Sequence, residues 1–341
     1  MSDGDGDGSS SSSSAGLRPR FGYVRAMAPA STANLGPGFD VFGLALDAYS
    51  DEVELMVLGD GDRDGKGSLA IETYGASMKV EHIPVDAERN SAGLALLSMI
   101  KAYGINDRIR VRIRKGVPAG YGLGSSAASA VAAVRALDAM YGLELDPLVL
   151  LGHAARGEVA SAGTAHYDNV AASLLGGFVV VRQEPLHAIS IDPPDDLLLC
   201  VATPRVDVPK GKTGVARSVL PDRVPLGKMV SNVANASLLV AGLLRKDVRL
   251  IADAMMRDAV VEPARMHIIP AYAGVKRAAL DAGALAVTIS GAGPSMLIMV
   301  DAERAEGVAK AVNEAYSRDG IECSIRICRA AKGATVLERR L

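Results

Sequence analysis

The sequence predicts an α+β fold arranged in two domains. At 341 residues the chain is long enough for two domains, and 49% of its residues are hydrophobic, enough for two sizeable cores. Predicted strands and helices follow one another without strict βα alternation. This mixture is typical of α+β layers rather than of a doubly wound parallel sheet.

The first domain is expected over residues 21–194, after a tail at 1–20 whose Asp/Gly/Ser composition is typical of disorder. Residues 24–27 read as a strand and 28–40 as a long loop, because small, turn-forming residues dominate there. The later elements expected in this domain are a strand at 52–58, a surface loop at 59–68, a helix at 90–103, a strand at 109–114, helices to about residue 140 and over 146–161, a short unit at 164–177 and a strand at 178–182.

The second domain is expected over residues 195–341, because Pro185, Pro193 and Pro194 bracket the boundary. Its expected elements are a strand at 197–202, a loop at 203–226, helices at 228–245, 247–258 and 270–282, strands at 286–289 and 296–300, a helix at 303–318 and strands at 322–328 and 334–338.

The composition narrows the class of partner. A net charge of −2 and the absence of Trp argue against a protein that binds a nucleic-acid polymer or an anionic membrane. No apolar run long enough to cross a membrane lacks charges, and the N-terminus has neither the basic start nor the apolar stretch of a signal peptide. Three cysteines without a Cys-x-x-Cys pair favour reduced thiols. We therefore expect a cytoplasmic protein that acts on a small molecule.

The most informative segment is Pro118-Ala-Gly-Tyr-Gly-Leu-Gly-Ser-Ser-Ala-Ala128, which lies between a predicted strand and a predicted helix. Glycines let the backbone turn its N–H groups toward a ligand, and a helix N-terminus adds unpaired donors and positive potential. Such a segment suits phosphate. Ser125 and Ser126 add hydroxyls that can cap the helix or reach a metal held by the phosphates. The alternative is a plain glycine turn with a serine N-cap.

Two common phosphate motifs fit less well. Gly211-Lys212-Thr213 ends like a P-loop, but Val206 stands where the first glycine should be. Gly122-Leu-Gly124-Ser-Ser-Ala127 is formally a dinucleotide fingerprint. In that fingerprint, however, the strand runs straight into the first glycine, and paired serines have no role.

Four further segments carry a family resemblance: Ser31-Thr-Ala-Asn34-Leu-Gly-Pro-Gly-Phe-Asp40, Gly163-Thr-Ala-His166-Tyr-Asp-Asn169, Glu262-Pro-Ala-Arg265 and Ser290-Gly-Ala-Gly-Pro-Ser295. With the glycine loop and Gly157-Glu158, they resemble the GHMP small-molecule kinases, most closely the homoserine kinase branch. The likeness covers roughly residues 22–341. In one departure, Ala172 replaces the family's usual proline, which we expect to alter a helix start rather than the chemistry.

The resemblance implies a GHMP N-terminal domain of the ribosomal-S5-like type, a ferredoxin-like C-terminal domain, and ATP with Mg²⁺. It assigns Mg²⁺ to Ser126 and Glu158, both hard oxygen donors. For Glu158 the alternative is a solvated helix carboxylate, and for Asn90, which is placed near adenine, a plain N-cap. The nucleotide-binding residues implied are Pro118, Ala119, Gly120, Tyr121, Gly122, Leu123, Gly124, Ser125, Ser126, Ala127, Ala128 and Asn90. Because this loop holds no lysine, we expect the helix dipole, the serine hydroxyls and Mg²⁺ to stabilise the phosphates.

The resemblance also implies the acceptor, L-homoserine, and its contacts. Asp40 is expected to bind the ammonium, while Arg217 and Arg265 bind the carboxylate, since arginine offers a bidentate fork. Arg205 is the fallback for Arg217, and a surface ion pair is the alternative for any of these arginines. The contacts expected around the hydroxyl and side chain are Asn34, His166 and Asn169.

The expected catalytic residues are Asn169, Glu158 and Ser126. An amide does not usefully accept a proton, so we hypothesise that Asn169 orients the hydroxyl, whose proton passes to the γ-phosphate or to solvent. Asp168 could serve instead, although neighbouring helix residues point about 100° apart.

The function implied is ATP-dependent phosphorylation of L-homoserine to O-phospho-L-homoserine, in threonine biosynthesis, by a homodimer. Within the same class, mevalonate kinase and archaeal shikimate kinase are the alternatives. From other classes, the alternatives are an NAD-dependent oxidoreductase and a catalytically inactive binding protein of the GHMP fold.

Overall fold

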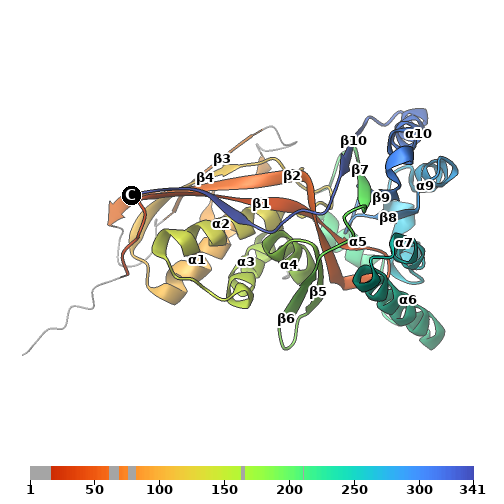
Figure 1. Ribbon diagram of the computed structural model, residues 1–341. Coiled ribbons are helices and arrows are strands. Elements are labelled where there is room, and N and C mark those ends of the chain that lie inside the picture. Colours follow the sequence, from red (N-terminus) through yellow and green to blue (C-terminus); the bar gives the residue numbers. More distant parts are fainter. Residues whose placement is uncertain (1–16, 61–68, 76–81, 163–165, 210) are drawn as a thin grey trace, which may run out of the picture.

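The computed structural model describes residues 17–60, 69–75, 82–162, 166–209 and 211–341, and these residues form two β-sheets with helices layered on them (Figure 1). The first sheet has the order β11-β1-β2-β4-β3, with β5 paired to β2 and β6 to β5. Its strands are β1 (Tyr23–Asn34), β2 (Gly38–Asp60), β3 (Leu69–Tyr74), β4 (Asp107–Arg114), β5 (Phe178–Arg182), β6 (His187–Ile191) and β11 (Thr335–Arg340). The expected strands at 109–114 and 178–182 are confirmed, whereas β3 and β6 were not anticipated.

The loop expected at residues 28–40 is wrong. β1 continues to Asn34, β2 begins at Gly38, and the two strands pair antiparallel around a tight turn. The small residues of β1 are buried instead of solvated, and Ser173 Oγ of a covering helix donates to the Pro29 carbonyl at 2.8 Å. Small side chains are typical of turns, but in this strand they let helices approach closely.

Four helices cover one face of this sheet (Figure 1): α1 (Ser91–Tyr103), α2 (Ser125–Tyr141), α3 (Pro147–Ala162) and α4 (Tyr167–Leu175). The helices expected at 90–103, to about 140 and over 146–161 are confirmed. α4 begins at Tyr167, and Ala172 lies buried well inside it. The replacement of proline by Ala172 therefore does not alter a helix start. Residues 163–165 of the resembling segment lie outside the described residues, as do residues 61–68 of the expected surface loop.

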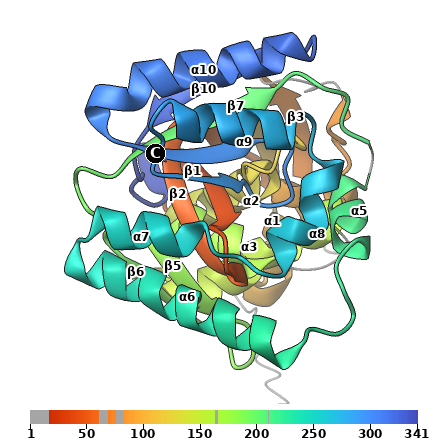
Figure 2. The ribbon, with the colours of Figure 1, turned by 90° about the vertical axis from the view of Figure 1, so that its right-hand side faces the viewer.

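The second sheet has the order β10-β7-β9-β8, and every neighbouring pair is antiparallel. Its strands are β7 (Leu198–Pro204), β8 (Ala286–Ile289), β9 (Met296–Val300) and β10 (Cys323–Cys328). α9 (Tyr272–Asp281) precedes β8, and α10 (Ala305–Arg318) joins β9 to β10. This βαββαβ order is the ferredoxin-like arrangement that was expected. Figure 2 shows α9 and α10 over the outer face of the sheet.

The chain between β7 and α9 holds α5 (Lys212–Ser218), α6 (Leu226–Arg245), α7 (Val248–Met255) and α8 (Val261–Arg265). The helices expected at 228–245 and 247–258 are confirmed. The uninterrupted loop expected at 203–226 is wrong, because α5 forms inside it and buries Ala216. By length and composition alone α6 could also cross a membrane, but a single helix of this kind is weak evidence of a membrane protein.

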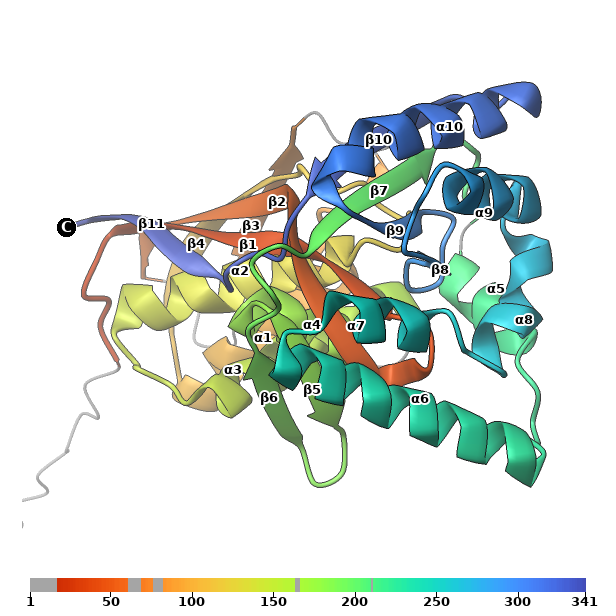
Figure 3. The ribbon, with the colours of Figure 1, turned by 45° about the vertical axis from the view of Figure 1, so that its right-hand side comes forward.

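The two sheets share part of one core. Leu44 of β2 and Leu123 of the glycine loop belong to the same apolar cluster as Val201 of β7 and Leu239 of α6. Figure 3 shows the elements β2, β7 and α6. The last strand, β11, leaves the second half of the chain and pairs with β1 in the first sheet. A division at residue 194 remains a prediction, and it does not separate the two sheets completely. The shared core fixes the cavity that lies between them.

Candidate active site

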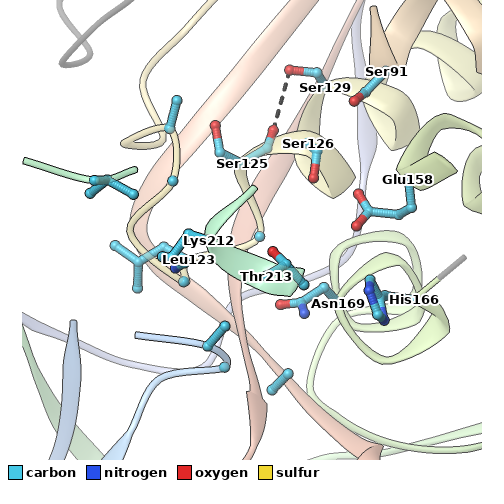
Figure 4. A pocket seen from close by; sticks show the side chains of 18 of the residues that line it. Ser91, Leu123, Ser125, Ser126, Ser129, Glu158, His166, Asn169, Lys212 and Thr213 are labelled. Atoms are coloured by element: carbon cyan, nitrogen blue, oxygen red, sulfur yellow. Dashed lines mark hydrogen bonds between the residues drawn. The ribbon is translucent and has the colours of Figure 1, made fainter. Parts of the chain in front are cut away.

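A cavity of about 380 Å³ lies where the two halves of the chain meet. The glycine loop and the start of α2 form one wall, with Glu158 of α3 beside them. The cavity is completed by the tip of the β1–β2 hairpin, the start of α4, the segment around α5, Arg265 of α8 and the loop between β8 and β9. Figure 4 labels lining residues from the glycine loop, α2, α3, α4 and α5. Almost every sequence segment that carried the resemblance therefore meets at one place.

The glycine loop is held by contacts that leave no room for side chains. At Gly122, which has a φ of +77°, a Cβ would lie 2.3 Å from the Ser290 carbonyl oxygen and 2.7 Å from that of Gly293. At Gly124, with a φ of +65°, a Cβ would lie 2.0 Å from Ser31 Oγ. Ser290 Oγ also lies 2.7 Å from the Gly122 carbonyl, to which it donates a hydrogen bond. The two glycines are thus needed for their positive φ and for the close approach of the other segments.

The paired serines have different surroundings. Ser125 Oγ donates to the Val117 carbonyl at 3.0 Å, so its hydroxyl fixes the turn between β4 and α2. Ser126 faces the cavity opposite Glu158 (Figure 4), to which its hydroxyl is hydrogen-bonded. Of the two hydroxyls, Ser126 is the one placed to reach a ligand.

Of the residues that the resemblance implies for nucleotide binding, the structure places some on the cavity wall and others away from it. Those that line the cavity are Ala119, Gly120, Gly122, Leu123, Gly124, Ser125, Ser126 and Asn90. Pro118, Tyr121, Ala127 and Ala128 do not line it. Tyr121, for example, is buried and donates its hydroxyl to the Val206 carbonyl at 3.0 Å. Asn90 is both a cavity residue and an N-cap, since its Oδ1 accepts from the Gly93 N–H at 3.1 Å.

A buried ion pair beneath the loop was missed by the sequence reasoning. Asp51 accepts from the N–H groups of Gly116 at 2.9 Å and Val117 at 3.0 Å, and it pairs with Lys115 Nζ. Lys115 Nζ also donates to the Ser125 carbonyl at 2.9 Å. This network fixes the chain where β4 enters the loop. The available signal was a lysine directly after a strand of alternating arginine and aliphatic residues and before the glycines.

Two buried carboxylates face the cavity. Burial raises the pKa of Glu158 to about 7, and the charge of Asp168 adds to the rise, while the hydrogen bond from Ser126 opposes it. Burial and the nearby Asp40 raise the pKa of Asp168 to about 6. A cation beside these groups would offset the cost of their charge.

The donor set fits Mg²⁺. Within the described ranges, no three His, Cys, Asp or Glu side chains are placed to hold a metal ion by themselves. Mg²⁺ commonly takes only one or two carboxylates from the protein and completes its octahedron with water and phosphate oxygens. The Glu158 carboxylate and the Ser126 hydroxyl match that requirement, and the neighbouring glycine loop suits the phosphates.

On another wall of the cavity, Arg217 and Asp40 form an ion pair. Arg217 Nη2 lies 2.8 Å from each Asp40 carboxylate oxygen and 3.0 Å from His166 Nδ1. Because a guanidinium only donates, Nδ1 is the acceptor and the proton of a neutral His166 lies on Nε2. Burial and the charge of Arg217 lower the pKa of His166, which favours this neutral form. Arg217 Nε is buried, and no hydrogen-bond partner for it exists among the described residues.

Arg265 lies buried beside this pair. Its Nε donates to the Ala216 carbonyl at 2.9 Å and its Nη1 to the Gly291 carbonyl at 3.1 Å, so it joins α5 to the β8–β9 loop. Asn34 Nδ2 donates to the same Gly291 carbonyl at 3.1 Å. Phe39 packs near both arginines, with its ring centre 5.1 Å from Arg265 Cζ and 5.3 Å from Arg217 Cζ. The structure therefore brings together the residues that were expected to bind the acceptor substrate.

Asn169 lies between this wall and the glycine loop. Its Oδ1 accepts from Ser31 Oγ at 2.9 Å, and its Nδ2 lies 3.3 Å from Asp168 Oδ1. Asp168 also accepts from the Asn169 backbone N–H at 2.7 Å. Both side chains line the cavity, so the helical geometry that was expected to separate them does not remove Asp168 from it.

Lys212 and Thr213 of α5 also enter the cavity (Figure 4), and neither was expected there. The signal in the sequence is Gly211-Lys212-Thr213, although this segment does not complete a P-loop. The fallback residue Arg205 lies elsewhere, in an exposed ion pair with Glu322 at 2.8 Å. Arg205 therefore has no place in this site.

Comparison with known proteins agrees with this geometry. The model described as GHMP kinases N terminal domain matches residues 90–177, and the one described as GHMP kinases C terminal matches residues 239–318. A homoserine kinase of Thermoplasma acidophilum is 40% identical over 315 residues, covering 92% of this chain and 96% of the relative. The chain belongs to the GHMP kinases. The resemblance stated from the motifs is confirmed.

Solved structures of GHMP kinases superpose on the chain over most of its length. A homoserine kinase from Cytophaga hutchinsonii has a TM-score of 0.84 and 36% identity, and the match covers 93% of this chain and 98% of the other. A mevalonate kinase from L. major, solved with R-mevalonate, has a TM-score of 0.67 at 15% identity, with 92% and 96% covered. The second match shows a common fold alone. The NAD-dependent oxidoreductase alternative is wrong, because the chain is a GHMP kinase. The strand before the glycine loop, β4, lies in a mixed sheet, antiparallel to β2 and parallel to β3.

Proposed function

We propose that the chain phosphorylates the hydroxyl of L-homoserine with ATP, giving O-phospho-L-homoserine, an early step toward threonine. One observation carries this proposal: the Asp40–Arg217 pair and the buried Arg265 line the same cavity as the glycine loop. A charged pair of this kind suits a small zwitterion, and the loop suits a polyphosphate. The 40% identity to a curated homoserine kinase supports the same acceptor.

On the nucleotide side, the N–H groups of residues 120–127 and the N-terminus of α2 are assigned to the phosphates of ATP. Ser126 and Glu158 are assigned to Mg²⁺, and Asn90 to the neighbourhood of the adenine. When bound, Mg²⁺ neutralises charge on the phosphate oxygens. Ser125 keeps its structural hydrogen bond to the Val117 carbonyl.

On the acceptor side, Asp40 is assigned to the ammonium of homoserine and the two arginines to its carboxylate. Arg217 still has a buried Nε without a partner in the described part of the chain, a donor that a carboxylate would satisfy. His166 accepts from Arg217 through Nδ1, and Asn34 donates to the Gly291 carbonyl beside Arg265. These contacts would fix the acceptor hydroxyl toward the phosphates.

In the reaction, the bond between the γ-phosphorus and the oxygen that bridges it to the β-phosphate breaks. Its electron pair leaves with ADP, and the acceptor hydroxyl oxygen forms the new bond to phosphorus. Asn169 is assigned to orient that hydroxyl, since Ser31 already fixes the amide. The hydroxyl proton passes to an oxygen of the transferred phosphoryl group or to solvent, because an amide does not accept it. Positioning and charge stabilisation then supply the catalysis.

The acceptor is tested by measuring ADP release from Mg-ATP with L-homoserine, mevalonate or shikimate, together with NAD binding. ADP release that depends on L-homoserine alone is the expected result. Turnover of mevalonate or shikimate, but not of L-homoserine, would replace the acceptor. Nucleotide binding without any acceptor turnover would favour an inactive binding protein.

We also propose a homodimer located in the cytoplasm. The family resemblance suggests the dimer, and α6 exposes an apolar face that a second copy could cover: Leu226, Met229, Val230 and Val233. Light scattering of the purified chain should give twice the mass of the monomer. A monomer at micromolar concentration would contradict the dimer.

A further inference from the structure

Lys212 is the one lysine at the mouth of the phosphate side of the cavity that the described residues do not place in an ion pair. It opens α5, directly after Gly211, and its side chain is half-buried. Its Nζ donates to the Gly293 carbonyl, a neutral acceptor. Lys115, the other lysine that lines the cavity, is already paired with Asp51.

The contact with Gly293 places this ammonium beside the glycine loop. The Gly293 carbonyl oxygen packs so closely on Gly122 that an added Cβ there would lie 2.7 Å from it. The same oxygen therefore contacts both Lys212 Nζ and the backbone of the loop. The chain just before α5 also packs on the glycine loop, since a Cβ at Gly120 would lie 3.2 Å from Val208 Cγ1.

The electrostatics of the position favour an anionic ligand. Burial, and after it the charge of Arg265, lower the pKa of Lys212 to about 7. Its charged form is thus disfavoured until an anion arrives. No carboxylate is among the causes of this shift. Two carboxylates of the same cavity are engaged elsewhere, Asp40 with Arg217 and Glu158 with Ser126.

We propose that Lys212 contacts the phosphoryl group that is transferred and is a catalytic residue, supplying from α5 the positive charge that the glycine loop lacks. The inference rests on the proposed phosphoryl transfer but not on the identity of the acceptor. Negative charge on the terminal phosphoryl oxygens would hold the ammonium, and the ammonium would stabilise that charge as the bond to the leaving oxygen breaks. The Gly293 carbonyl orients Nζ before the nucleotide binds.

The test compares Lys212→Met, which keeps the length of the side chain without its charge, with Lys212→Arg, which keeps the charge. Lys310→Met is the matched control, because Lys310 lies on α10 with 80% of its side chain exposed. Thermal unfolding of all three variants first establishes that they fold like the parent chain.

The first readout is nucleotide affinity, measured by calorimetry with Mg-ADP and with the Mg²⁺ complex of the non-hydrolysable analogue β,γ-imido-ATP. We expect Lys212→Met to lose about tenfold or more in affinity for the analogue while its affinity for ADP changes by less than about twofold. A contact to a charged group of this kind is worth that much. Lys212→Arg should retain most of the parent chain's affinity for the analogue relative to ADP. An equal loss for both nucleotides, or no loss for either, would overturn the contact with the terminal phosphoryl group.

The second readout is the split between kcat and KM. We expect Lys212→Met to lower kcat by about 10²- to 10³-fold, as the removal of one charge-stabilising donor does elsewhere, with the KM for the acceptor nearly unchanged. A rise in the acceptor KM at unchanged kcat would overturn the proposal and place Lys212 on the carboxylate of the acceptor. If the parent chain turned over no L-homoserine but the analogue preference still depended on Lys212, the acceptor would be wrong and this inference would stand.

Discussion

Ser31 Oγ lies 2.9 Å from Asn169 Oδ1 and donates a hydrogen bond to it across 138 residues of sequence. Ser31 Oγ is also the atom that a Cβ at Gly124 would approach to 2.0 Å. Ser31 thus links the β1 end of the hairpin, the glycine loop and the start of α4. The groups assigned to the phosphates and to the acceptor hydroxyl are positioned against one another by this single side chain.

Gly124→Ala should weaken nucleotide binding. Its φ of +65° strains any L side chain, and the new methyl group would displace Ser31 from Asn169. We expect at least a tenfold weaker affinity for Mg-ADP and a loss of kcat, measured by calorimetry and ADP release. Gly152→Ala in α3 is the matched control, since nothing lies within 4 Å of a Cβ there. Wild-type affinity in Gly124→Ala would show that the loop tolerates the strain.

Asn169→Ala should lower kcat by about 10²-fold with little change in the acceptor KM, because the amide is assigned to orientation of the hydroxyl rather than to binding. Ser31→Ala, which leaves the amide present but frees it, should give a smaller loss. Steady-state kinetics with saturating Mg-ATP measure both. An unchanged kcat in Asn169→Ala would remove the residue from the mechanism, and Asp168 would then be the next group to test.

Much of this site could be predicted from the sequence because its motifs are local. The glycine loop and the segments around Asn34, Asn169 and Arg265 each carry their pattern within about ten residues. The hairpin could not be predicted, because Ala and Ser fit a turn and a tightly covered strand equally well until the covering helix is known. Lys212 and the Asp51–Lys115 pair depend on contacts between distant segments, and no local pattern reports those.

Arg265→Lys should raise the KM for L-homoserine by about tenfold or more, since a lysine cannot make the two contacts to carbonyls and still offer a fork to a carboxylate. Nucleotide affinity should change less than the KM, because Arg265 donates to the Ala216 and Gly291 carbonyls and not to the glycine loop itself. Arg205→Lys is the control, since Arg205 is in an exposed pair with Glu322 outside this cavity. A raised KM in the control but not in Arg265→Lys would reverse the assignment of the two arginines.

Glu158→Gln should stabilise the metal-free protein at pH 8 while abolishing activity. Burial raises the pKa of Glu158 from 4.5 to about 7, so between these values the folded state binds more protons than the unfolded state. The free energy of unfolding therefore falls as the pH rises through this window. Above it, the full loss of stability from ionising the buried carboxylate is present. The glutamine variant never carries that charge, so it should gain roughly 1–3 kcal/mol over the parent chain at pH 8.

At pH 4.5 the two proteins should unfold at nearly the same temperature, because Glu158 is then protonated in the folded parent chain. Thermal unfolding from pH 4.5 to 8 in the presence of a chelator measures the difference, and added Mg-ATP should stabilise only the parent. Asp168→Asn should show a similar trend with a smaller window, since burial and Asp40 raise the pKa of Asp168 to about 6. If Glu158→Gln were less stable than the parent at pH 8, the carboxylate would be structural, and its assignment to Mg²⁺ would fail.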